Sequence, residues 1–135
     1  MLVYTDSIEY AKRIQTALLP PTNFIKRNLP EHFILFKPRD IVSGDFYWMM
    51  NKDDKIIIAA ADCTGHGVPG ALMSMLGISF LNKIVLESKH TDPGNILNIL
   101  RKEIIKSLKQ KGSSDEQMDG MDIALCTFDR ERSEL

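Results

Sequence analysis

The fold of this chain is most clearly indicated by residues 41–62, whose sequence is IVSGDFYWMMNKDDKIIIAAAD. Two runs rich in β-branched and aromatic side chains flank the polar segment 51–54, and this pattern predicts a β-hairpin that turns at that segment. Opposed residues in an antiparallel hairpin lie at equal distances from its turn. The midpoint between Asp45 and Asp62 falls inside the polar segment. The sequence therefore predicts that these two carboxylates lie directly opposite each other, on one face of the ribbon.

Two carboxylates so close repel each other unless one is protonated or a cation lies beside them. Carboxylate and backbone carbonyl oxygens are ligands that suit Mg²⁺ or Mn²⁺ and not Zn²⁺. We therefore expect a divalent cation site at Asp45 and Asp62. The alternative is that one aspartate caps the following loop while the other faces solvent at the end of the sheet.

The glycine-rich stretch after the hairpin, Cys63–Gly70 (CTGHGVPG), admits other interpretations. Its last six residues match the G-x-G-x-x-G pattern of dinucleotide-binding loops, but a hairpin precedes them where a β-α-β unit would be needed. Cys63 and His66 have a C-x-x-H spacing, but the other Cys and His residues are too scattered to complete a zinc site. A Cys nucleophile with a His base would lack a third group to orient it. We expect that the glycines let the backbone pass close to a metal and that His66 organises the loop.

Helices and further strands are expected on both sides of this region. Pro20-Pro21 ends the first helix, and the cap-then-proline sequence Thr91-Asp92-Pro93 starts the last one. In chain order, we expect a helix over 4–19, a loop over 22–31, strands over 32–37, 41–50 and 55–62, helices over 71–87 and 93–108, a polar loop over 111–118 and a strand over 122–129. The last strand has a turn after it but no partner, so we expect the chain to end partway through a larger domain.

The helix at 4–19 carries a 4-3-4-3 spacing typical of a short coiled-coil seam with one polar member. The seam residues are Tyr4, Ile8, Ala11, Gln15 and Leu18. Either the helix packs on its own domain, or it is a linker helix that pairs with another chain. The Pro-Pro break before the globular part favours the second interpretation, which allows a homodimer through this helix.

The composition narrows the classes of function. The chain has 135 residues, with 17 Lys+Arg against 18 Asp+Glu, so its near-neutral charge excludes binding of nucleic acid through bulk positive charge. No apolar run is expected to be long enough for a membrane span, and the N-terminus is too polar for a signal peptide. The 2 cysteines are too few for a disulfide framework, so we expect a cytoplasmic protein with reduced thiols.

Two stretches together resemble the first two metal motifs of SpoIIE/RsbU-type protein serine/threonine phosphatases, which belong to the metal-dependent type 2C (PPM) superfamily. They are PRDIVSGDFYW at 38–48 and ADCTGHGVPGA at 61–71. The segments YAKRIQ at 10–15 and LLPP at 18–21 resemble the linker helix of that family, and DGMDIAL at 119–125 resembles its next strand. The resemblance implies an α+β fold, a β-sandwich flanked by helices and here truncated after about four strands. Residues 1–21 would be a linker or regulatory helix, and 22–135 the N-terminal part of the phosphatase domain.

The resemblance also implies a site and a reaction. Two Mn²⁺ or Mg²⁺ ions would be bridged by Asp62, and Asp45 and the main-chain carbonyl of Cys63 would each bind one ion. Arg39 would hold the substrate phosphate. Water activated by the metals would attack phosphoserine or phosphothreonine in line, without a covalent enzyme intermediate. The loop residues of the site would be Gly44, Gly65, His66 and Gly67. The implied partners are an anti-anti-sigma-like phosphoprotein substrate and an upstream sensor module.

One departure from the family lowers the expected activity. Family members supply further metal-binding aspartates from two later motifs, and neither motif can be placed on this sequence. Asp122 matches a position that is not usually a ligand, and we interpret Asp119–Asp122 as a polar turn in preference to a metal site. We therefore expect the 135-residue chain alone to bind metal weakly and to have little phosphatase activity. The competing hypotheses are a non-catalytic signalling module with a vestigial metal site and, less favoured, a nucleotide-binding domain.

Overall fold

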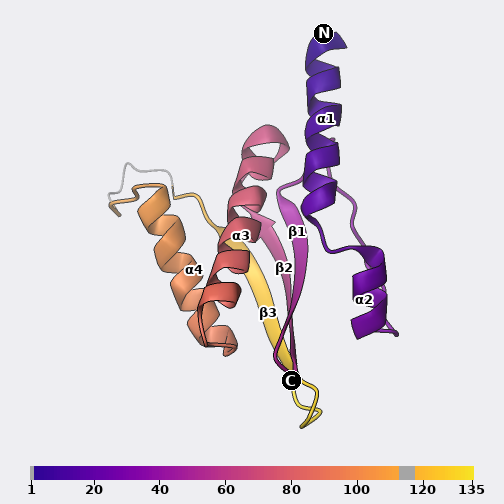
Figure 1. The fold of residues 1–135 in the computed structure, drawn as a ribbon. Helices are drawn as coiled ribbons and strands as arrows, with labels where there is room; N and C mark the ends of the chain where they lie inside the picture. Colours follow the sequence, from indigo (N-terminus) through magenta and orange to yellow (C-terminus); the bar gives the residue numbers. More distant parts are fainter. Residues whose placement is uncertain (1, 113–117) are drawn as a thin grey trace.

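The computed structural model describes residues 2–112 and 118–135, whose strands form one antiparallel sheet in the order β1-β2-β3 (Figure 1). The strands are β1 (Asp45–Lys52), β2 (Lys55–Cys63) and β3 (Met121–Asp129). The helices are α1 (Leu2–Leu18), α2 (Thr22–Asn28), α3 (Gly67–Glu87) and α4 (Pro93–Ser107). Helices and an antiparallel sheet confirm the α+β class, although the described residues contain three strands and not the four expected.

The hairpin of β1 and β2 forms as predicted, with a tight turn at Asp53-Asp54. Asp53 has φ 55°, a left-handed conformation that Asp tolerates better than most residues. Strand β1 begins at Asp45, whereas we had expected it to begin at Ile41. The reason is that the backbone of Ser43 is hydrogen-bonded by the side chain of Gln15 and not by a neighbouring strand.

Helices α3 and α4 cover one face of the sheet and form the main core with it (Figure 1). Both helices exist where the sequence predicted them, and the Asp92 side chain caps α4 by accepting a hydrogen bond from the Asn95 amide at 2.9 Å. Helix α3 begins at Gly67, four residues before the predicted start at Ala71, because a proline at position 69 is tolerated in the first turn. The core residues at the centre of this interface are Trp48, Ile57, Leu81, Val85, Ile96 and Leu100.

Helix α3 is the one described helix that is long and apolar enough, by length and composition, to cross a membrane. This differs from the expectation that the chain has no such run. Half of its most apolar window is buried inside the structure, where it packs on the sheet. Burial in a core accounts for its apolar composition.

The opposite face of the sheet is only partly covered, and two expectations about this region are wrong. Residues 22–28 form α2 and not a loop, and Ile25 of this helix packs on Met49 and Ile56. The segment 32–37 is extended but does not pair as a strand. It lies over the sheet face and not along a strand edge, so its backbone groups find no ladder partner. Phe33 is 90% exposed.

The last strand lies at an edge of the sheet. Of the strands in the described residues, β3 pairs only with β2, in the antiparallel register Lys55↔Asp129. The expected polar loop at 111–118 lies mostly outside the described residues. The structure thus places the start of the predicted strand at 122–129 beside β2, at the end of the sheet that carries Asp62.

Candidate metal and phosphate site

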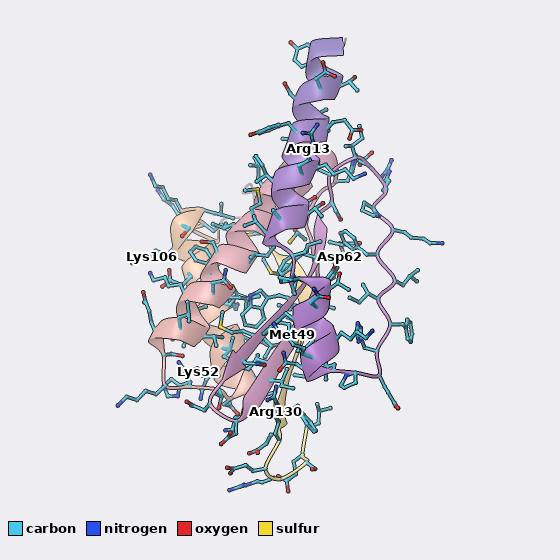
Figure 2. The ribbon with its side chains drawn as sticks, turned by 45° about the vertical axis from the view of Figure 1, so that its right-hand side comes forward. Arg13, Met49, Lys52, Asp62, Lys106 and Arg130 are labelled. Atoms are coloured by element: carbon cyan, nitrogen blue, oxygen red, sulfur yellow. The ribbon has the colours of Figure 1, made fainter. Side chains whose placement is uncertain are left out.

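The predicted carboxylate pair is confirmed by the strand register. Asp45 and Asp62 are cross-strand partners at the open end of the hairpin, and both are solvent-exposed. Figure 2 shows Asp62 toward the α1 end of the sheet, whereas Lys52 and Arg130 lie at the opposite, turn end. Hairpin pairing alone therefore brings together two carboxylates that are 17 positions apart in the sequence.

The electrostatics of the pair show the cost of leaving it without a cation. Partial burial raises the pKa of Asp45, and the hydrogen bond to the Asp62 carboxyl and the charge of Asp62 raise this pKa further. Burial, followed by the charges of both aspartates, raises the pKa of the Cys63 thiol to about 12. That thiol is protonated at neutral pH, so Cys63 is not an activated nucleophile. Its backbone carbonyl is the group that remains as a candidate ligand.

A third aspartate lies in line with the pair. Asp122 is the cross-strand partner of Asp62 on its other side, so three aspartates follow one another across the end of the sheet. We had interpreted Asp122 as part of a polar turn, because no pattern in the sequence predicts the register of β3 on β2. Thr64 holds the residue before β3 at this end of the sheet, because its amide and its hydroxyl both donate to the Gly120 carbonyl, at 2.9 and 3.0 Å.

The glycines of both motifs serve a close approach of backbone to backbone. A Cβ at Gly44 or at Gly70 would lie 2.9 Å from the carbonyl oxygen of Gly65, a distance that real Cβ atoms do not reach. Gly65 itself has φ 87° and Gly67 has φ 60°, both in the left-handed region that favours glycine. The loops that carry the two aspartates are therefore locked together. Because the sheet in front of them is antiparallel, the dinucleotide interpretation of Gly65–Gly70 has no support in the fold.

The loop before Asp45 is also held by α1. Gln15 is 5% exposed, and its Nε2 donates to the Ser43 carbonyl at 2.6 Å and to the Ser74 hydroxyl at 2.9 Å. The Ser43 amide donates to Gln15 Oε1 at 2.8 Å, and the Ser43 hydroxyl accepts a hydrogen bond from the Asp45 amide at 2.9 Å. The polar member of the predicted coiled-coil seam thus faces its own domain. Sequence reasoning missed this role of Gln15, for which an isolated glutamine in an apolar stripe was the only signal.

A small polar cavity opens beside the carboxylates. It has a volume of about 190 Å³ and is lined by both aspartates and by Arg39, Asp40 and His66. The His66 Nδ1 lies 3.2 Å from the Asp40 Oδ2, and this pair joins the loop of the first motif to the loop of the second. The structure therefore brings Arg39, Asp45, Asp62 and His66, four of the predicted site residues, around one cavity, whereas Cys63 lines a neighbouring one.

The donor set fits a hard divalent cation only in part. Asp45, Asp62 and the Cys63 carbonyl offer oxygen, the ligand type that Mg²⁺ and Mn²⁺ prefer. Among residues 2–112 and 118–135, no group of three or more His, Cys, Asp and Glu side chains is placed to hold a metal ion. The described residues thus offer two carboxylates and one backbone carbonyl as candidate ligands, and the expectation of weak binding stays a prediction.

Comparisons with known proteins give a family match and a solved relative. Residues 52–135 match the family described as Stage II sporulation protein E (SpoIIE). The structure superposes on the SiaA-PP2C domain of Pseudomonas aeruginosa with a TM-score of 0.80 and 38% sequence identity, over 96% of this chain and 50% of that chain. Comparison with curated proteins gives no match. The chain therefore spans half the length of the solved relative that it resembles.

These similarities place the chain in the class of type 2C phosphatase-type domains, and its paired aspartates lie at the end of an antiparallel sheet. The chain belongs to the SpoIIE family, and its structure corresponds to the N-terminal portion of such a domain.

Proposed function

We propose that the full-length protein is a metal-dependent phosphatase that hydrolyses phosphoserine or phosphothreonine on a signalling protein. The observation that supports this most directly is the cross-strand pairing of Asp45 with Asp62, next to a cavity that also contains Arg39. Two like charges in one pairing position are unfavourable without a cation, so the arrangement favours a metal-binding role over a structural one.

Each residue of the site has a proposed role. Asp62 and Asp45, together with the Cys63 carbonyl, would hold two Mn²⁺ or Mg²⁺ ions. When bound, these ions supply Lewis-acid stabilisation and an activated water for attack on phosphorus. Arg39 lies on the wall of the same cavity, and its planar guanidinium can bind two phosphate oxygens at once. The substrate phosphate would thus be held between the arginine and the carboxylate end of the sheet.

The proposed biological setting follows the family. The substrate would be a phosphoprotein of the anti-anti-sigma type, and an upstream sensor module would act through α1. The protein would work in the cytoplasm and would not bind nucleic acid, since its Lys+Arg and Asp+Glu counts nearly balance.

Phosphate release from a phosphoserine peptide, with and without Mn²⁺, tests this proposal on the full-length protein. We expect Mn²⁺-dependent turnover, and we expect Asp62→Asn to reduce it at least about 100-fold because the bridging charge is lost. Asp53→Asn is the matched control, since this exposed aspartate lies at the turn end of the same hairpin. Turnover that is independent of Mn²⁺, or that survives Asp62→Asn, would contradict the proposal. For the 135-residue chain alone we expect little or no turnover.

The second candidate is a non-catalytic module that dimerises through α1. It is favoured by the apolar side chains that α1 leaves in solvent, where Tyr10 is 62% and Ile14 is 44% exposed. The N-terminal half of α1 also projects beyond the rest of the molecule (Figure 1). Light scattering on the wild type and on Ile14→Glu separates the candidates. A dimer that this variant dissociates, together with absent phosphatase activity in the full-length protein, would favour the non-catalytic module.

A further inference from the structure

Asp40 and His66 form a contact between two loops that the strand ladder does not connect. Asp40 precedes β1 within the first motif, and His66 precedes α3 within the second. The carboxylate of Asp40 can only accept a hydrogen bond, so the His66 Nδ1 donates to its Oδ2 across 3.2 Å. A Cβ at Gly67 would lie 3.9 Å from the same oxygen, so the carboxylate rests against the first turn of α3.

The position of His66 does not by itself require a histidine. His66 is the residue that precedes the first turn of α3, yet its side chain caps no backbone amide of the helix. Its side chain is 66% exposed and that of Asp40 is 39% exposed. Ion pairs this exposed contribute little to global stability, so the pair is better suited to fixing a local position than to holding the fold.

The residue that the pair would fix is Arg39. Arg39 is the chain neighbour of Asp40, is itself exposed, and lines the cavity that contains Asp45 and Asp62. No strand ladder holds its segment, since residues 39–42 form bends between the extended segment and β1. The two aspartates, in contrast, are fixed relative to each other by the pairing of β1 with β2.

We propose that Asp40 and His66 are positioning residues that hold Arg39 over the carboxylate end of the sheet, so that it can bind the substrate phosphate. This inference rests on the proposed phosphatase function and adds two residues to it. The bond from His66 Nδ1 to Asp40 performs this task, and the second ring nitrogen is not needed for it. Loss of the pair therefore weakens phosphate binding but leaves metal binding in place.

The test uses the full-length protein and four variants. Asp40→Ala and His66→Ala remove the pair, His66→Asn keeps an amide nitrogen near the position of Nδ1, and His66→Gln places one near the position of Nε2. We expect both alanine variants to raise KM for the phosphoserine peptide about fivefold with kcat changed less than about twofold. The double alanine variant should be no worse than either single one, because both remove the same contact. His66→Asn should recover most of the loss, and His66→Gln should not.

Two measurements without turnover complete the test. Binding of inorganic phosphate in the presence of Mg²⁺, followed by ³¹P NMR line broadening, should weaken about fivefold in both alanine variants. The Mn²⁺ dissociation constant from calorimetry should stay within about twofold of the wild type, because the ladder holds the aspartates. His90→Ala is the matched histidine control, since this exposed residue follows the far end of α3, which at 21 residues is about 30 Å long.

The outcomes separate this inference from the proposed function. Wild-type protein without Mn²⁺ binding or turnover would overturn the proposed function itself. An active wild type with unchanged KM and phosphate binding in both alanine variants would overturn only the positioning role. Recovery by His66→Gln and not by His66→Asn would overturn it too, since it would mean that the Nε2 position contacts the substrate directly.

Discussion

Replacing Gln15 on α1 by alanine should lower the free energy of unfolding by more than a typical substitution at the protein surface does. Gln15 joins α1 to two other parts of the structure through its bonds to the Ser43 backbone and the Ser74 hydroxyl. All three residues are buried, so no water can readily replace the lost partner. The change thus tests whether α1 is an integral part of the domain or a loosely attached linker.

The expected loss in the free energy of unfolding depends on which buried polar groups lose their hydrogen-bond partners when Gln15 is replaced. The single hydrogen of the Ser74 hydroxyl is shared between the Ala71 carbonyl at 2.9 Å and the Ser43 carbonyl at 3.2 Å, so the Ser43 carbonyl keeps part of its bonding. The Ser43 amide loses its acceptor, and an unsatisfied buried amide costs about 1–3 kcal/mol. With the small void left by the side chain, we expect a loss of about 2–3 kcal/mol in the free energy of unfolding. For a chain of this size that corresponds to a decrease of about 6–15 °C in Tm.

Thermal unfolding followed by circular dichroism measures this decrease. Lys12→Ala is the control, because it changes an exposed residue on the same helix. Gln15→Glu keeps the side-chain volume but places a carboxylate oxygen against the Ser43 carbonyl, so it should lower Tm at least as much as alanine. A decrease in Tm under about 2 °C for Gln15→Ala would contradict this prediction and would show that α1 contributes little to the stability of the domain.

Three further predictions concern the site. Because the pKa of Asp45 is raised in the fold, the metal-free protein loses stability as pH rises through that pKa. The variant Asp45→Asn should therefore raise Tm at pH 7, by an amount equivalent to less than about 1 kcal/mol. The difference in Tm between the variant and the wild type should vanish below 3.8, the ordinary pKa of an aspartate. Gly70→Ala should cost about 1–3 kcal/mol in urea unfolding, since its Cβ would meet the Gly65 carbonyl oxygen at 2.9 Å; an unchanged midpoint would contradict the close approach. Iodoacetamide at pH 7.5 should label exposed Cys126 and spare Cys63, because Cys63 is buried and the pKa of its thiol is about 12. Mass spectrometry of the labelled peptides measures the extent of labelling at each cysteine, and equal labelling would be inconsistent with the structure.

Prediction from the sequence succeeded where a local pattern was enough. The turn composition and the two apolar runs around it predicted the hairpin, and the position of the turn then predicted the opposition of Asp45 and Asp62. Helix α4 was recognised from its cap, Asp92, and from the proline that follows it. Each of these features depends on residues within one or two elements of each other, so chain connectivity alone limits the possible arrangements.

Prediction failed where another element competed for the same backbone. Residues 32–37 have the composition of a strand, but the segment lies across the sheet face, where no strand edge is available to pair with it. Residues 41–44 also have strand composition, yet the buried side chain of Gln15 takes the hydrogen bonds of Ser43. β-propensity describes the fit of a side chain to a pleated surface, and it does not say whether a neighbouring strand is present.

The hairpin and the two aspartates that face each other on it can be derived from the amino-acid sequence alone, because hairpin geometry relates residue number directly to position. Only the tertiary structure placed Asp122 next to Asp62 and the Asp40–His66 pair beside Arg39. The first contact spans two helices, α3 and α4, and the second spans the whole hairpin. How such segments return to one end of the sheet depends on the packing of the core, which no local pattern in the chain encodes.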